Sequence, residues 1–247
     1  MKIDILTLFP GMFVSPFTES IIKRAVEKGL VDINAINIRE YAEDRHQQVD
    51  DYPYGGGAGM VLKPDVVIRA LENTKSADAY TVYLSPQGKK LTQEIVRDLS
   101  RHSHLVLLCG HYEGIDDRIL SLVDEEISIG DYILTGGELP AMVLIDAVAR
   151  LLPGVLGDDA SAGEESFTNQ LLEYPQYTRP AIYRQKEVPA ILLSGHHEKI
   201  RRWRLQQSLL KTLLKRPELL LERDFTAEEK KILAQMLFER EREDEKN

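Results

Sequence analysis

The chain has 247 residues, of which 43% are hydrophobic and 29% charged, a composition typical of a globular protein with a sizeable core. Its formal net charge is −9, and its single cysteine, Cys109, excludes an internal disulfide framework and a cysteine metal cage. No apolar run approaches the roughly 20 residues of a membrane span, and residues 1–10 are too short and too acidic for a signal peptide. We therefore expect a cytoplasmic protein with no membrane partner.

Short apolar runs alternate with amphipathic stretches as far as residue 152. Repeated β–α order with apolar strands predicts an α/β fold, in which a mostly parallel sheet is covered by helices. Residues 153–175 are rich in glycine and acidic residues and predict a mobile connector. Two amphipathic stretches then predict a small C-terminal helical domain. The predicted strands are residues 2–9, 31–37, 80–84, 105–109 and 126–134. The predicted helices are residues 17–28, 64–73, 93–100, 117–122, 139–152, 195–215 and 227–242.

Charge is distributed unevenly between the two parts of the chain. Residues 1–165 hold 15 Lys and Arg against 27 Asp and Glu, a balance of −12, whereas residues 166–247 hold 16 against 13, a balance of +3. Residues 196–216 contain seven basic residues and a single acid, Glu198. Such a cluster indicates a surface for a phosphate backbone, and the alternative is an ordinary solvated helix face.

Three loops combine glycine and proline and follow predicted strands: residues 83–88, 109–116 and 128–140. Open α/β sheets bind ligands at the carboxyl ends of their strands, so we expect these loops to converge on one pocket. The third loop carries only two charges, Asp131 and Glu138, and no Lys or Arg. It therefore favours a ligand held by main-chain groups and apolar walls over a nucleotide di- or triphosphate. Three ordinary strand-to-helix turns are the alternative interpretation.

Common catalytic motifs are missing from the sequence. It has no G-x-G-x-x-G after a strand, no Walker loop, no G-x-S-x-G and no H-E-x-x-H. His196, His197 and Glu198 are adjacent in a predicted helix and point in different directions, so no metal site is predicted there. An uncharged cofactor pocket and a basic second domain together suggest group transfer to a nucleic acid.

Nine motifs follow one another over nearly the whole chain. They are residues 53–60 (PYGGGAGM), 83–88 (YLSPQG), 109–118 (CGHYEGIDDR), 128–140 (SIGDYILTGGELP), 150–157 (RLLPGVLG), 177–180 (YTRP), 193–197 (LSGHH), 203–205 (WRL) and 216–219 (RPEL). In this order they resemble the motifs of the bacterial tRNA (guanine-N1)-methyltransferase family, TrmD. The resemblance implies a trefoil-knotted α/β domain of the SPOUT type, an exception to the rule that chains do not thread loops. It also implies a homodimer that binds S-adenosyl-L-methionine and methylates N1 of the guanosine immediately 3′ of the tRNA anticodon.

The resemblance also implies a division of the chain and a set of cofactor contacts. Residues 1–157 would form the knotted cofactor-binding domain, residues 158–176 a flexible linker, and residues 177–247 a helical tRNA-binding domain. Thirteen residues from the three loops would bind the cofactor. They are Leu84, Ser85, Pro86, Gly110, Tyr112, Glu113, Ile129, Gly130, Tyr132, Leu134, Gly136, Gly137 and Pro140.

Catalysis at guanine N1 needs a base for the N1 proton and a cation near O6. The resemblance assigns these roles to a linker acid and to Arg150. The family's linker ends Asp-Ser-Phe, whereas this chain has Glu165 before Ser-Phe, so Glu165 is the candidate base and Glu164 a weaker one. Glutamate is one methylene longer than aspartate, a change to which catalytic geometry is sensitive. No metal ligands are predicted, although a magnesium ion is possible during methyl transfer. Candidate tRNA contacts are Arg179, Lys199, Arg201, Arg202 and Arg204.

Two other functions remain open at this point. One is a knotted methyltransferase that modifies a different RNA atom, such as a ribose 2′-hydroxyl. The other is a noncatalytic RNA-binding protein that retains the cofactor pocket, which the glutamate at the family's aspartate position makes conceivable.

Overall fold

The computed structural model describes residues 1–156, 166–167, 169–221 and 223–244, with side chains as far as residue 236. The chain divides into two compact units, Met1–Asp159 and Ala160–Asn247. The division falls inside residues 158–176, the stretch expected to be a linker. The roles assigned to the two units stay predictions.

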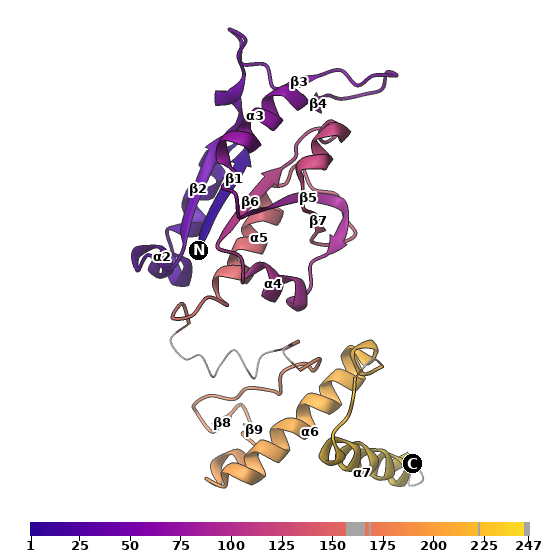
Figure 1. The fold of residues 1–247 in the computed structure, drawn as a ribbon. Helices are drawn as coiled ribbons and strands as arrows, with labels where there is room; N and C mark the ends of the chain where they lie inside the picture. Colours follow the sequence, from indigo (N-terminus) through magenta and orange to yellow (C-terminus); the bar gives the residue numbers. More distant parts are fainter. Residues whose placement is uncertain (157–165, 168, 222, 245–247) are drawn as a thin grey trace. The chain divides into compact units, whose positions relative to one another are not determined.

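A parallel sheet forms the centre of the N-terminal unit (Figure 1). Within residues 1–156 five strands pair in the order β2-β1-β6-β5-β7, and every pairing between them is parallel. The predicted α/β class with a mostly parallel sheet is therefore confirmed. The strands are β1 (Lys2–Thr7), β2 (Asp32–Asn37), β5 (Ala79–Lys90), β6 (His104–Cys109) and β7 (Glu125–Ser128).

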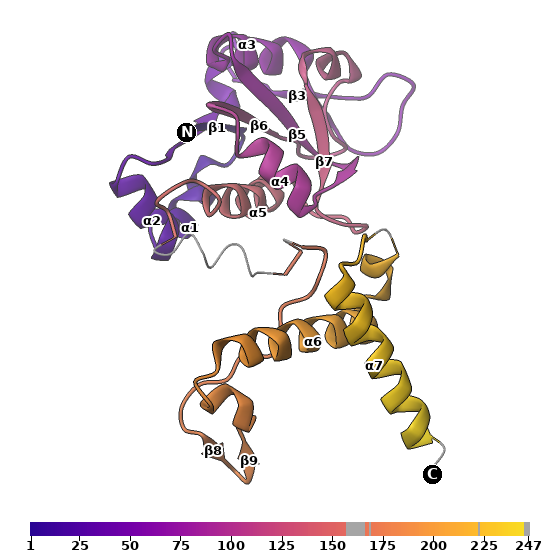
Figure 2. The ribbon, with the colours of Figure 1, turned by 60° about the horizontal axis from the view of Figure 1, so that its bottom comes forward.

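Helices cover both faces of this sheet (Figure 2). Side chains alternate along β6: Leu105 and Leu107 pack in one core with α2, α4 and α5, while Val106 and Leu108 pack in the other with α3. All four are fully buried, which explains why β6 reads as a continuous apolar run. The α-helices of this unit are α1 (Val14–Phe17), α2 (Ser20–Glu27), α3 (Pro64–Thr74), α4 (Gln93–Leu99) and α5 (Glu138–Ala149). Short 3-10 helices are η1 (Pro10–Phe13), η2 (Ile38–Tyr41) and η3 (Asp117–Leu122).

The ends of two predicted strands were wrong, and one predicted helix is of the 3-10 type. Strand β5 does not end at Leu84, because a bulge between Leu84 and Lys89 lets it pair with β7 again as far as Lys90. Strand β7 ends at Ser128 and not at residue 134. Ser128 turns the chain there, since its hydroxyl accepts from the backbone N–H of Gly130 at 3.2 Å, and Gly130 has a φ of +153° that favours glycine. Residues 117–122 form a 3-10 helix, η3.

The C-terminal unit is built on two helices, α6 (His197–Lys215) and α7 (Ala227–Asp244). Its core joins Leu209 of α6 and Ile232 of α7 with Leu171, which lies in the predicted linker and is only 8% exposed. The later part of the predicted linker therefore packs within this unit. The unit also contains an antiparallel pair, β8 (Ile182–Tyr183) and β9 (Lys186–Glu187), and the 3-10 helices η5 (Ala190–Leu193) and η6 (Pro217–Leu220).

Candidate functional site

The three glycine- and proline-containing loops meet at one cavity of about 270 Å³ in the N-terminal unit. They converge because β6, β5 and β7 are neighbours in a parallel sheet, so the loops leave the same edge. All thirteen residues predicted to bind the cofactor line this cavity. Their role in binding stays a prediction, but their gathering in one place fits it. The cavity is also lined by Tyr83, Gln87, His111, Gly114, Ile127, Ser128, Ile133 and Thr135.

The first loop is held close to β7 by a glycine. A Cβ atom at Gly88 would lie 2.4 Å from the backbone N of Ile127, so only glycine lets β5 return to β7 after the bulge. Within the bulge, the hydroxyl of Ser85 accepts from the backbone N–H of Gln87 at 3.1 Å. The excursion of residues 85–87 thereby forms a fixed wall of the cavity.

The second and third loops touch through their backbones. Gly137 N–H donates to the carbonyl of Gly110 at 2.8 Å, and His111 forms a β-bridge with Gly136. A Cβ at Gly137 would lie 2.7 Å from the Cα of Cys109, and one at Gly110 would lie 2.8 Å from the Tyr83 hydroxyl. Gly137 therefore lets two main-chain segments approach each other more closely than a residue with a Cβ allows, and Gly110 leaves room for the Tyr83 side chain.

The polarity of the lining suits a ligand without phosphate groups. The described lining residues include no Lys or Arg, and Glu113 is their acidic member. Tyr83 is 8% exposed, and burial together with the nearby Glu126 carboxylate raises the pKa of its phenol to about 12. Within the described part of the chain, no side chain hydrogen-bonds to Nδ1 of His111, although this atom is buried. A cationic ligand with hydrogen-bonding groups fits such a cavity better than an anion does.

The comparison with known proteins agrees with the motifs. Residues 1–222 match the family described as tRNA (Guanine-1)-methyltransferase TrmD. The chain belongs to this family. It is 68% identical over 241 residues to the tRNA (guanine-N(1)-)-methyltransferase of Syntrophomonas wolfei, a match that covers 98% of this chain and 99% of that protein. It is 61% identical over 240 residues to the protein of the same name from Carboxydothermus hydrogenoformans, a match that covers 97% of this chain and 95% of that protein. The protein of that name from Geobacillus kaustophilus is 56% identical over 246 residues, a match that covers 98% of this chain and all of that protein.

Of the two candidate catalytic residues of this TrmD-family chain, the structure describes only Arg150, which is not among the residues that line the cavity. Arg150 follows the last residue of α5 and is half-buried, whereas Pro140, near the start of the same helix, lines the cavity. Ten residues of α-helix separate the two by about 15 Å at 1.5 Å per residue. Glu165 and Glu164 lie outside the described residues. Their role as base stays a prediction.

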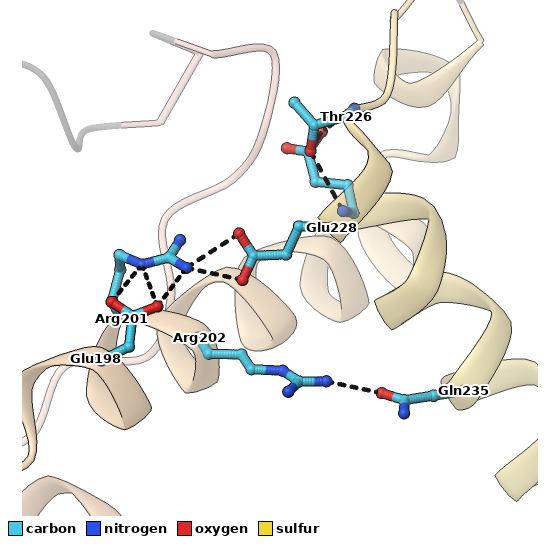
Figure 3. A network of polar contacts seen from close by, with 7 residues as sticks. Glu198, Arg201, Arg202, Thr226, Glu228 and Gln235 are labelled. Carbon is cyan, nitrogen blue, oxygen red and sulfur yellow. Dashed lines mark hydrogen bonds and ion pairs between the residues drawn. The ribbon is translucent and has the colours of Figure 1, made fainter.

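The candidate tRNA-contacting arginines of α6 are tied to neighbouring side chains (Figure 3). Arg201 contacts two carboxylates, those of Glu198 and Glu228, each at 2.8 Å. These hydrogen bonds raise the pKa of Arg201 and bridge α6 to α7. Arg202 donates to the side-chain oxygen of Gln235 at 3.1 Å, also between α6 and α7. Arg201 therefore links α6 to α7 through ion pairs that balance its charge. From the sequence alone, such an arginine cannot be distinguished from one that contacts a phosphate.

The remaining candidates of the C-terminal unit differ in exposure. Arg204 is half-buried, and its guanidinium carbon lies 4.7 Å from the centre of the Tyr174 ring. Both side chains line a second cavity of about 480 Å³ between α6 and residues 169–174. Lys199 and Arg179 are exposed, so their charges are accessible to a phosphate backbone.

Sequence reasoning missed a buried acid beneath the cavity. Glu138 is 2% exposed and sits in the first turn of α5, where the helix dipole favours a carboxylate. Its Oε1 accepts from the hydroxyl of Thr7 at 2.8 Å, and its Oε2 lies 2.4 Å from the position of a Cβ at Gly136. Glu138 thus fixes the start of α5 to β1 and lies directly behind the third loop. An acid after paired glycines in an otherwise apolar helix is the signal that could have revealed it.

Within the described residues no three His, Cys, Asp or Glu side chains gather in a way that could hold a metal ion. In the same part of the chain, no helix is both long and apolar enough to cross a membrane.

Proposed function

We propose that this chain transfers the methyl group of S-adenosyl-L-methionine to N1 of the guanosine immediately 3′ of the anticodon in tRNA. Its membership of the TrmD family supports the reaction and the substrate. The single structural observation that carries the proposal is the cavity formed by three loops whose glycines bring main-chain atoms together. We propose a cytoplasmic location, where tRNA is available.

The cavity residues suit the donor because it carries a sulfonium and an ammonium group but no phosphate. When bound, S-adenosyl-L-methionine supplies an electrophilic methyl group. The main-chain groups around Gly110 and Gly137 offer hydrogen bonds to its polar atoms, and Leu84, Leu134 and Pro140 offer apolar walls. Glu113 is the carboxylate in the lining that can balance positive charge. We propose that the chain follows the knotted path that membership of this family implies.

Guanine N1 carries a proton, and its lone pair becomes nucleophilic only as that proton leaves. We assign its removal to the Glu165 carboxylate and the stabilisation of charge at O6 to the Arg150 guanidinium. Both side chains would have to lie within hydrogen-bonding reach of the purine, the carboxylate to accept the N1 proton and the guanidinium to stabilise the negative charge at O6. No step is assigned to a magnesium ion, and assays with and without a chelator would decide whether one is needed.

A homodimer is the assembly that this assignment requires. Arg150 lies about 15 Å along α5 from the cavity of its own chain, so a second copy is the means of bringing the two together. Helix α5 has apolar side chains on its outer surface as well as its inner one: Leu139 and Val143 are each 49% exposed. These side chains support a self-complementary interface on α5.

The test of the base compares Glu165→Gln, Glu165→Asp and Glu164→Gln in a methyl-transfer assay with labelled donor and tRNA. We expect Glu165→Gln to lose about 10²- to 10⁴-fold in rate, because it cannot accept a proton, while donor affinity is little altered. Glu165→Asp should retain most of the activity, and Glu94→Gln, an exposed acid on α4, is the matched control. A greater loss in Glu164→Gln would move the role to that residue.

The same assay separates the noncatalytic alternative. A zero rate in the unaltered chain, together with intact donor binding, would favour an RNA-binding protein that has lost its chemistry. The salt dependence of tRNA binding tests the exposed cations: Lys199→Gln should lower the slope of log K against log salt by about 1.

A further inference from the structure

A glycine-rich arm, residues 52–60, connects two short antiparallel strands, β3 (Asp50–Asp51) and β4 (Val61–Leu62), and extends away from the body of the N-terminal unit (Figure 1). Its glycines have positive φ values of +89°, +79°, +133° and +84° at Gly55, Gly56, Gly57 and Gly59. Such a backbone path is open to glycine and strained for other residues. The arm nevertheless carries two large aromatic side chains, Tyr52 and Tyr54, which are 77% and 100% exposed.

The base of the arm is fixed to the wall of the cavity. Glu113 N–H donates to the carbonyl of Met60 at 3.1 Å, and Leu62 N–H donates to the carbonyl of Gly114 at 3.0 Å. A Cβ at Gly59 would lie 2.3 Å from the carboxylate of Glu113, so the arm lies directly against this side chain. Glu113 and Gly114 both line the cavity. The arm that carries the exposed tyrosines is therefore fixed, at its base, beside the cavity into which a methyl acceptor must reach.

The charge around the arm indicates which part of an RNA the tyrosines can contact. Asp50 and Asp51 directly precede Tyr52, and Arg118, a cation whose charge interacts with Tyr54, is already paired with the Asp116 carboxylate at 2.8 Å, so these charges do not favour a phosphate group beside the tyrosines. The uncharged face of a base is not repelled, and bases in single-stranded RNA loops are free to stack on aromatic rings. Because the methylated guanine itself must enter the cavity, a neighbouring base is the one that remains outside it with a free face.

We infer that Tyr54 is a tRNA-binding residue, whose ring stacks on a base adjacent to the guanine that is methylated. This inference rests on the proposed function and adds a contact to it. Tyr54 is not among the residues that line the cavity, so we expect its loss to act on tRNA and to leave donor binding in the absence of tRNA unchanged.

The experiment compares Tyr54→Ala, which removes the ring, with the matched control Tyr54→Phe, which keeps the ring and removes only the hydroxyl. Stacking of one base on an aromatic side chain predicts roughly 5- to 150-fold weaker tRNA binding for Tyr54→Ala and near-normal binding for Tyr54→Phe. A tRNA with 2-aminopurine next to the target guanosine reports the stacking directly. Its fluorescence should be quenched by the unaltered chain and by Tyr54→Phe, and markedly less by Tyr54→Ala.

Three results would overturn the inference. The first is a Tyr54→Ala variant that binds and methylates tRNA as the unaltered chain does. The second is weaker donor binding in that variant without tRNA, which would make the arm a cover for the donor. The third is a change in its oligomeric state by light scattering, which would make the arm a contact between copies. If the unaltered chain itself fails to methylate tRNA, it is the proposed function that fails, and the two failures are thereby distinguished.

Discussion

Replacing Gly137 by alanine tests whether the close contact between the second and third loops holds the cavity together. The residue has a φ of −79°, which alanine adopts without strain, so the effect of the substitution is steric. The added Cβ would lie 2.7 Å from the Cα of Cys109 and 3.1 Å from the backbone N of Gly110. Both are backbone atoms of the end of β6 and cannot turn aside as a flexible side chain does.

We expect Gly137→Ala to lower the free energy of unfolding by about 1–3 kcal/mol, the usual cost of one extra carbon in a tightly packed site. The loops must separate to admit the methyl group, which lengthens the 2.8 Å hydrogen bond from Gly137 N–H to the Gly110 carbonyl. We therefore also expect donor affinity to fall at least about tenfold, which corresponds to about 1.4 kcal/mol. Urea unfolding and calorimetric titration with S-adenosyl-L-methionine measure the two effects.

Gly11→Ala is the matched control for this substitution. Gly11 has no positive φ, and a Cβ there meets nothing within 4 Å, so its replacement should leave stability and donor affinity almost unchanged. The steric reasoning would be refuted by a Gly137→Ala chain that is as stable as the unaltered one and binds the donor with the same affinity.

Three further predictions concern buried groups. Burial raises the pKa of the Tyr83 phenol to about 12, whereas tyrosine in the unfolded chain has a pKa of about 10. The neutral phenol therefore contributes its full stabilisation below about pH 10, and this stabilisation is lost as the pH rises toward 12. In urea unfolding, the free energy of unfolding should fall less steeply over this pH range in Tyr83→Phe than in the unaltered chain. Burial, with a smaller effect of Glu138, raises the pKa of the Cys109 thiol, so a thiol reagent should label this residue only after unfolding, and rapid labelling of the native chain would contradict its burial. Glu229→Ala should destabilise the C-terminal unit by about 0.5–2 kcal/mol, because the Glu229 carboxylate accepts from Thr226 N–H at 2.8 Å in a capping box at the start of α7; an unchanged melting curve would show that the cap is unimportant.

The central sheet could be predicted because its strands are buried on both faces and therefore read as short apolar runs between helical stretches. Strand β7 was predicted too long for the same reason, since Ile133 and Leu134 are apolar and look like its continuation. The turn at Ser128 and Gly130 sends them instead into the cavity lining. Apolar character alone does not distinguish a strand from the wall of a binding site.

Contacts between distant residues could not be predicted from local patterns. The hydrogen bond of Thr7 to Glu138 spans 131 positions, and no periodicity reveals that a buried acid will find a hydroxyl on the first strand. The return of β5 to β7 at Gly88 depends on backbone contact with Ile127, which is also invisible in the sequence. In contrast, the thirteen cavity residues could be predicted because they belong to family motifs, whose positions the fold brings together.

The pairing of charges on α6 likewise could not be predicted from the sequence. Seven basic residues between residues 196 and 216 suggested a phosphate-binding surface, but the partner of Arg201 on α7, Glu228, is 27 positions away. Only the packing of α7 on α6 shows that this cation is already paired, whereas Lys199 stays exposed.

The proposed methyl transfer is tested most directly by locating the methyl group on tRNA after incubation with this chain and S-adenosyl-L-methionine, using nuclease digestion and mass spectrometry. We expect N1-methylguanosine at the nucleotide immediately 3′ of the anticodon, and no product from a tRNA with adenosine at that position. A methyl group on a ribose hydroxyl, or on a base elsewhere in the tRNA, would contradict the proposed reaction.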